Sequence, residues 1–240
     1  MFPLKDDVPS RSFPLVTVAL IVVNVLVYLY EAALGFDPIR GARLYEAFVL
    51  EFGLVPCRLT ASCPPALSTA LAGAPDPWLT VLTSMFVHGG LFHVGGNMLY
   101  LWIFGDNVED AMGRGRFLVF YLLCGGAAAA AQSLANPASS VPMVGASGAV
   151  SGALGAYLIL YPNARVWTLI IFGFFWRVVP IPALIVLGFW IVVQVLNGLL
   201  TFGHDRVGGV AFLAHIGGFV AGMILVNVLR QRSRILYRRI

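Results

Sequence analysis

Residues 142–152, PMVGASGAVSG, place Ser147 among glycines and alanines at the start of an apolar segment. The segment ends at Tyr161, before Pro162 and Asn163. If it crosses a membrane as a helix, about 15 residues at about 1.5 Å each cover only about 22 Å of a hydrocarbon core about 30 Å thick. One end of the helix must then begin below the membrane surface, and Ser147 stands at such an end.

The composition indicates an integral membrane protein. Of 240 residues, 59% are hydrophobic and 11% are charged, whereas soluble domains carry about 25% charged residues. Several apolar runs approach the roughly 20 residues that cross a bilayer as a helix, which favours an all-α bundle over a β-barrel. The net charge of +4 comes from arginines near segment ends, where they set orientation, so no nucleic-acid partner is expected.

We predict one membrane domain over residues 1–240, a bundle of six transmembrane helices. The expected spans are 15–34, 91–108, 117–134, 147–161, 181–202 and 210–229. The first span carries Asn24 as its strongly polar side chain, and Glu109 after the second span is assigned a structural pairing or capping role. A loop over 35–87 with a short interfacial helix near 45–54 joins the first two spans, and an arginine-rich tail covers 230–240.

The distribution of basic residues predicts the orientation. Residues 166–176 are apolar but too short to cross the membrane, so we interpret them as interfacial or re-entrant. With six spans, eleven of the fifteen Lys and Arg residues then lie on the side of both chain termini. Because cytoplasmic loops are enriched in Lys and Arg, we expect a multi-pass plasma membrane protein with cytoplasmic termini.

The three cysteines do not form a disulfide framework or a metal-binding spacing. Cys57 and Cys63 share the long loop, which is expected to lie outside the cell, where they either pair or remain as two thiols. Cys124 lies in an apolar segment, where a packing role is expected.

Four polar side chains reach one depth in this topology. Ser147 and His215 each lie about 8 Å inside helices that enter from the outside. His93 and Asn97 lie near the outer end of the second span, and their separation of four residues puts them on one helical face. Polar groups that converge within a membrane indicate a functional site.

Small residues allow the helices that carry these groups to approach each other. Gly148 and Gly152 form a stripe on the fourth span, and Gly218 and Gly222 form another on the last span, on the face of His215. Such stripes let two helix backbones pack in contact within lipid. We therefore expect Ser147 to lie within reach of His215.

The residue types predict serine hydrolase chemistry. A serine hydroxyl becomes nucleophilic when a neutral imidazole takes its proton, which assigns Ser147 as the nucleophile and His215 as the base. Asn97, His93 and the backbone N–H of Ser147 are the candidates to stabilise an oxyanion, and Gly145 allows an unusual turn there. Because we place no carboxylate in the outer half of any span, we expect a dyad rather than a triad.

Three stretches together resemble the rhomboid intramembrane serine proteases of the six-span bacterial form. They are HGGLFHVGGNMLYLWIFGDNVED at 88–110, GASGAVSGALGAY at 145–157 and AHIGGFVAG at 214–222. The resemblance implies hydrolysis of single-pass membrane proteins near the outer end of their span, without a cofactor. It assigns the same roles to Ser147, His215, His93 and Asn97, and it implies that the fifth span and the loop at 203–209 move to admit substrate.

Two features depart from that family. Some members carry an aromatic residue one turn after the nucleophile, where this chain has Ser151, which leaves open how the base is held. Some members also have a Trp-Arg pair in the first outer loop, and the corresponding loop of this chain, residues 35–87, has none. His88, just before the second span, is interpreted as interfacial or as a structural hydrogen-bonding residue.

Two other functions remain as alternatives. A catalytically inactive relative would bind membrane clients without cleaving them, but such a scaffold has no evident use for this set of polar residues. A small-solute transporter is disfavoured because the sequence has no inverted repeat and no acidic residue near the membrane midplane.

Overall fold

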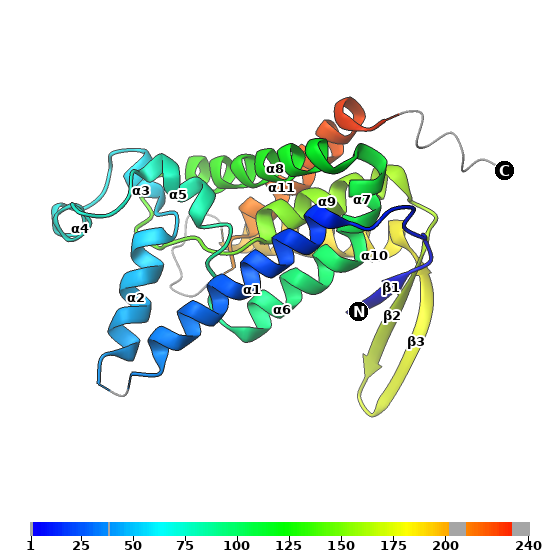
Figure 1. The fold of residues 1–240 in the computed structure, drawn as a ribbon, viewed down its shortest axis with the longest axis horizontal. Coiled ribbons are helices and arrows are strands. Elements are labelled where there is room, and N and C mark those ends of the chain that lie inside the picture. Colours follow the sequence, from blue (N-terminus) through cyan, green and yellow to red (C-terminus); the bar gives the residue numbers. More distant parts are fainter. Residues whose placement is uncertain (1, 38, 202–209, 232–240) are drawn as a thin grey trace.

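Long apolar helices pack side by side in the computed structural model, which describes residues 2–37, 39–201 and 210–231 (Figure 1). Within these residues, four helices are long and apolar enough to cross a membrane, namely α1 (Leu15–Gly35), α8 (Arg114–Ala135), α10 (Ala183–Thr201) and α11 (Phe212–Leu229). A fifth apolar helix, α9 (Ser147–Leu160), is shorter. The described chain is therefore a mostly helical membrane protein.

A composite helix connects the long loop to α8. It consists of α6 (Leu91–Tyr100), a π-helical turn η1 (Leu101–Gly105) and α7 (Asp106–Met112), which follow one another without a break. Near its end, the Glu109 carboxylate accepts hydrogen bonds from the backbone N–H groups of Val16 (3.1 Å) and Thr17 (2.8 Å). These are N–H groups at the start of α1 that lack partners within that helix. The predicted capping role of Glu109 is thus confirmed.

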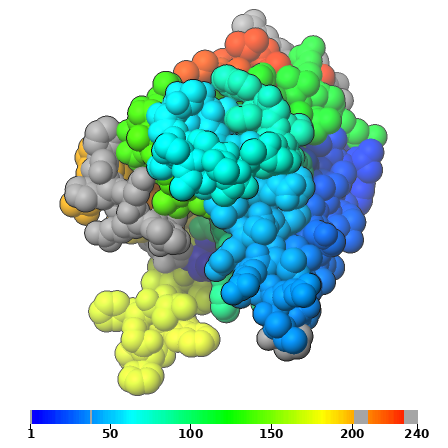
Figure 2. Space-filling model, turned by 90° about the vertical axis from the view of Figure 1, so that its left-hand side faces the viewer, coloured from blue at the N-terminus to red at the C-terminus, as the bar shows by residue number. Residues whose placement is uncertain are grey.

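Four shorter helices gather at one end of the bundle (Figures 1 and 2). They are α2 (Gly41–Phe52), α3 (Pro56–Leu59), α4 (Pro65–Ala70) and α5 (Pro77–Thr83). Cys57 and Cys63 form a disulfide in this region, so the alternative of two unpaired thiols is wrong. Cys124 is buried and free within α8, as its apolar surroundings in the sequence predict.

A three-stranded antiparallel sheet lies at the opposite end, which the all-α prediction did not include. Strand β2 (Arg165–Phe172) pairs with β1 (Phe2–Asp6) on one side and with β3 (Phe175–Pro182) on the other. The interpretation of residues 166–176 as interfacial or re-entrant did not anticipate strands. Their β-branched and aromatic residues favour extended structure, and Gly173, with a φ of 57°, lies in the turn between them.

Helix α9 lies at the centre of the bundle and is held by close backbone contacts. A Cβ atom on Gly218 would lie 2.0 Å from the carbonyl oxygen of Gly148, and one on Gly222 would lie 2.0 Å from that of Gly152. Only glycine fits at these two positions of α11, so the backbones of α9 and α11 are in contact. The missing side chains of Gly148 and Gly152 themselves face α8, which means that α9 needs small residues on two sides.

Candidate active site

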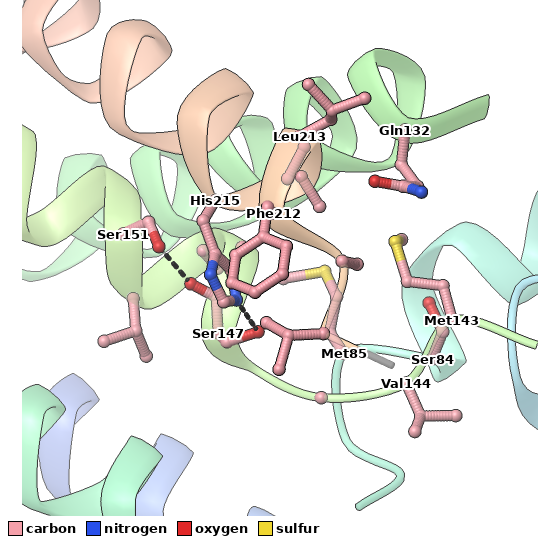
Figure 3. Close-up of a pocket in the computed structure, with 18 of the residues that line it drawn as sticks. Ser84, Met85, Gln132, Met143, Val144, Ser147, Ser151, Phe212, Leu213 and His215 are labelled. Carbon is pink, nitrogen blue, oxygen red and sulfur yellow. Dashed lines mark hydrogen bonds between the residues drawn. The ribbon is translucent and has the colours of Figure 1, made fainter. Parts of the chain in front are cut away.

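The first residue of α9 faces the fourth residue of α11. The Nε2 atom of His215 lies 2.8 Å from the Oγ atom of Ser147 (Figure 3). On the other side of the ring, Nδ1 lies 2.8 Å from the Oε1 atom of Gln194 in α10. Because an amide oxygen can only accept a hydrogen bond, this arrangement assigns the proton to Nδ1. The Nε2 atom is then free to accept the hydroxyl hydrogen of Ser147.

The partners of the His215 ring on α10 are residues that the sequence analysis missed. Besides Gln194, the Trp190 ring packs on His215 with the ring centroids 5.9 Å apart. Ser151 instead donates a hydrogen bond to the backbone oxygen of Ser147, at 2.6 Å. The base is therefore held from α10 rather than from α9. The available signal was Gln194 itself, a polar side chain in an apolar helix, one turn after Trp190.

A buried carboxylate in α1 was also missed. Glu31 lies in the outer half of the predicted first span and is fully buried, so the expectation of no carboxylate at that level is wrong. Its two oxygens accept the backbone N–H of His88 at 3.1 and 3.0 Å. Glu31 thus holds the loop before α6. Among the described residues, the two side-chain hydrogen bonds of the His215 ring go to Gln194 and Ser147, and neither goes to a carboxylate.

The turn before Ser147 is pinned by hydrogen bonds to this loop. Gly145 has a φ of 118°, a conformation that favours glycine, and its N–H donates to the carbonyl oxygen of Ser84 at 2.9 Å. The N–H of Ala146 donates to Nε2 of the buried His88 ring at 3.4 Å. His88 therefore has the structural hydrogen-bonding role that its position predicted, and it supports the residue next to Ser147.

Two donors from α6 converge on the same turn. A Cβ atom on Gly145 would lie 2.7 Å from Nε2 of His93 and 3.6 Å from Nδ2 of Asn97. Nδ1 of His93 accepts the N–H of Gly89 at 3.3 Å, which leaves the Nε2 proton directed at the turn. The buried Nδ2 group of Asn97 has no hydrogen-bond partner among the described residues. Two unused donors therefore lie beside the start of α9.

These groups line a cavity of about 970 Å³. Figure 3 shows Met85, Met143, Val144 and Leu213 around Ser147 and His215. This mixture of apolar side chains with a few polar groups is typical of a site that binds an organic ligand or a peptide. The loop at 203–209, which was expected to move, lies outside the described residues.

The fold and the site define a class of protein: a helical membrane bundle with a half-buried serine–histidine contact. The family model of the rhomboid domain matches residues 75–232, and the chain belongs to the rhomboid family.

Three relatives illustrate the similarity. The chain is 30% identical over 223 residues to RHOMBOID-like protein 1 of Arabidopsis thaliana, covering 89% of this chain and 52% of that protein. It is 36% identical over 156 residues to Rhomboid protease GluP of Bacillus subtilis, covering 65% and 27%. It is 30% identical over 172 residues to Rhomboid-type serine protease 2 of Emericella nidulans, covering 66% and 30%. The chain therefore spans about half or less of the length of these relatives.

Proposed function

We propose that this protein is an intramembrane serine endopeptidase that cleaves single-pass membrane proteins in or near the outer end of their transmembrane segment. The observation that carries the proposal is the 2.8 Å contact between Nε2 of His215 and Oγ of Ser147. Nδ1 of the same ring is occupied by Gln194, so the ring is oriented as a base toward the hydroxyl. Relatives named as rhomboid proteases add support.

The proposed reaction proceeds through an acyl-enzyme. His215 takes the hydroxyl proton while Ser147 Oγ bonds to the substrate carbonyl carbon, and the electrons of the C=O double bond move to oxygen. The imidazolium then gives its proton to the leaving nitrogen, the C–N bond breaks, and the new amine departs. Water, deprotonated by His215, next attacks the ester, and the serine leaves with the returned proton. No cofactor enters any of these steps.

The oxyanion needs donors that are already in place. Asn97 Nδ2 and His93 Nε2 point to the space beside Gly145, and the backbone N–H of Ser147 adds a third donor at the helix start. Donors without a partner in the resting protein need not break a bond before they bind the negative oxygen. Such preorganisation is usually the largest single contribution to this type of catalysis.

Gln194 and Trp190 act as positioning residues in this proposal. Gln194 holds the proton on Nδ1 of His215, and Trp190 packs against the ring. In a serine–histidine–aspartate triad, a carboxylate orients the ring in the corresponding way. An amide gives the orientation without adding a negative charge beside the ring.

The proposed topology has six spans, with both termini in the cytoplasm of a plasma membrane protein. The spans are α1, the composite α6–η1–α7, α8, α9, α10 and α11. The distribution of Lys and Arg supports this orientation. The Cys57–Cys63 disulfide in the loop between α1 and α6 also supports it, because disulfides persist outside the cytoplasm. The site then opens to the extracytoplasmic side.

Cleavage by the purified protein in lipid vesicles tests the function. A panel of single-span proteins is incubated with wild type, Ser147→Ala and His215→Ala, and each variant is expected to lose activity by a factor of about 10⁶. A fluorophosphonate probe should label wild type but not Ser147→Ala, and labelling should depend on His215. Equal cleavage by all three proteins would refute the assignment. Client binding by wild type without cleavage or labelling would establish the inactive alternative.

A further inference from the structure

The β2–β3 hairpin projects from the bundle (Figures 1 and 2), and its tip exposes large apolar side chains. Phe172, Phe174, Phe175 and Trp176 are 82%, 102%, 80% and 72% exposed. Proteins in water rarely expose such a contiguous aromatic cluster unless it binds something. The serine–histidine site does not use this cluster, since the hairpin lies at the end of the bundle opposite the outer-loop helices.

The root of the hairpin is tied to the ends of two membrane helices. The N–H of Ala183 donates to the oxygen of Ala164 at 2.8 Å, and the N–H of Leu184 donates to the oxygen of Pro162 at 2.9 Å. Strand β3 ends at Pro182, and α10 begins at the next residue. The root therefore lies at the level where apolar helices reach the edge of the hydrocarbon core.

The direction of the hairpin keeps its tip near that level. In Figure 1 the hairpin runs crosswise to α8, and in Figure 2 it projects from the rest of the molecule. A structure that leaves the bundle sideways at the membrane boundary extends along the membrane surface and not out into water. The tip thus meets the zone between lipid headgroups and acyl chains.

The apolar surface of the hairpin continues into that of α10. Val178 in β3 is 44% exposed, and Leu184 and Ile185 in the first turn of α10 are 54% and 52% exposed. No charged residue interrupts the sequence from 178 to 189. The exposed apolar side chains of a membrane helix face lipid. Because the apolar surface of α10 continues onto the hairpin, we expect the exposed apolar side chains of the hairpin to face lipid as well.

The charges on the hairpin match a lipid surface. Arg165 and Arg177 are both exposed, and the sequence from 165 to 182 contains no Asp or Glu. Basic side chains beside a membrane helix bind lipid phosphates. Tryptophan is enriched at membrane–water interfaces, and exposed aromatic side chains insert at the headgroup boundary.

We propose that the β2–β3 hairpin is an interfacial membrane anchor. Its aromatic tip inserts at the boundary between headgroups and acyl chains of the leaflet in which α9 ends and α10 begins, and Arg165 and Arg177 bind lipid phosphates. In the topology proposed above this is the inner leaflet. The inference rests on the hairpin and the neighbouring helix ends, and it is independent of the chemistry at Ser147.

A spin label on the full chain tests the anchor. The variant Phe174→Cys carries a nitroxide and is reconstituted in vesicles of phosphatidylcholine and phosphatidylglycerol. Collisions with oxygen, which concentrates in the bilayer, are compared with collisions with a water-soluble nickel chelate. The control is Ser68→Cys, an exposed position on α4 at the other end of the bundle. Because the Phe174 side chain is fully exposed, its replacement removes few contacts within the fold.

The anchor predicts an oxygen-to-nickel collision ratio several-fold higher at position 174 than at the Ser68→Cys control. Equal ratios at the two positions would place the tip in water and overturn the proposal. Protection from both reagents would also overturn it. In that case, spin–spin broadening that disappears on dilution with unlabelled protein would identify a second copy of the chain as the occupant. This measurement does not use a cleavage assay, so it tests the membrane anchor independently of the proposed protease activity.

Discussion

The Nδ1 atom of His215 and the Oε1 atom of Gln194 are 2.8 Å apart. This contact joins α11 to α10 and directs the opposite edge of the imidazole at Ser147. Gln194 is buried, so its hydrogen bond is not weakened by competing solvent. The orientation of the proposed base therefore depends on a helix that carries neither of the proposed reacting groups.

Replacement of Gln194 tests this dependence. Gln194→Leu is expected to lower kcat about 10- to 100-fold with little change in KM, because one buried hydrogen bond is worth about 1–3 kcal/mol. Gln194→Glu keeps the acceptor and should retain most of the activity. Leu196→Ala, at an exposed position on the same helix, is the control and should cleave normally. Equal losses in the Leu and Glu variants would argue against a positioning role.

Asn97→Ala should separate activity from stability. The Nδ2 group of Asn97 has no partner in the described resting structure, so its removal should leave the melting temperature unchanged or raise it. Loss of one oxyanion donor should lower kcat about 10²- to 10³-fold. Asn24→Ala is expected to show the opposite pattern, because the Asn24 amide donates to the oxygen of Leu20 at 2.7 Å and Asn24 does not line the cavity. An Asn97→Ala protein that unfolds early but cleaves normally would contradict the assignment.

Gly145→Ala should abolish most activity through the shape of the turn. Its φ of 118° is unfavourable for alanine, and the new Cβ would lie 2.7 Å from Nε2 of His93. Displacing this donor should lower the cleavage rate at least about a hundredfold. Gly126→Ala is the matched control, since a Cβ there meets nothing within 4 Å. Normal cleavage by Gly145→Ala would show that His93 is not needed at its observed position.

Loss of the Cys57–Cys63 disulfide should destabilise the outer loop region. The cysteines are six residues apart in the sequence, and closure of so short a loop contributes about 2 kcal/mol. Cys57 also donates its N–H to the oxygen of Ser139 at 3.0 Å, in the segment that leads to Ser147. A double variant, Cys57→Ser with Cys63→Ser, should unfold at a lower temperature than wild type. A reductant should lower the unfolding temperature of wild type to that of the variant and leave the variant unchanged. If the unfolding temperature of wild type does not change with the reductant, the prediction is refuted.

Asp6 should make stability depend on pH. Burial raises the pKa of Asp6 above its usual range, and the neighbouring Asp7 adds to this, whereas the hydrogen bond from the Tyr157 hydroxyl opposes it. An acid with a raised folded-state pKa loses its stabilising contribution as the pH rises through that value. Asp6→Asn, which can still accept the Tyr157 hydrogen bond, should therefore be more stable than wild type at neutral pH.

This difference should disappear near pH 3, below the ordinary aspartate pKa of about 3.9. Thermal unfolding of both proteins across this pH range provides the measurement. If wild type instead gains stability relative to Asp6→Asn on going from acid to neutral pH, the sign of the effect is wrong.

Local patterns were sufficient to locate the main helices and the four polar groups of the site. The apolar runs, the prolines that end them and the depth of Ser147 and His215 depend on residues close in sequence. The glycines at positions 218 and 222 predicted close backbone contact because spacing along one helix determines which side chains share a face.

Three features depended on contacts between segments distant in sequence. Glu31 is an isolated acid in the sequence, and only folding brings it to the backbone of His88. The hairpin at 165–182 is apolar enough to resemble a membrane segment, and its pairing with the N-terminal strand reveals it as sheet. Gln194 reaches His215 only because α10 packs beside α11.

The sequence by itself determined that the chain carries apolar helices of membrane-spanning length, and it predicted that a serine, two histidines and an asparagine lie at one depth. The tertiary structure decided what holds the histidine, what pins the turn and where the remaining apolar surface points. The physical reason is that hydrophobicity and helical periodicity act within one segment, whereas a hydrogen bond between two helices depends on the rotation and approach of both.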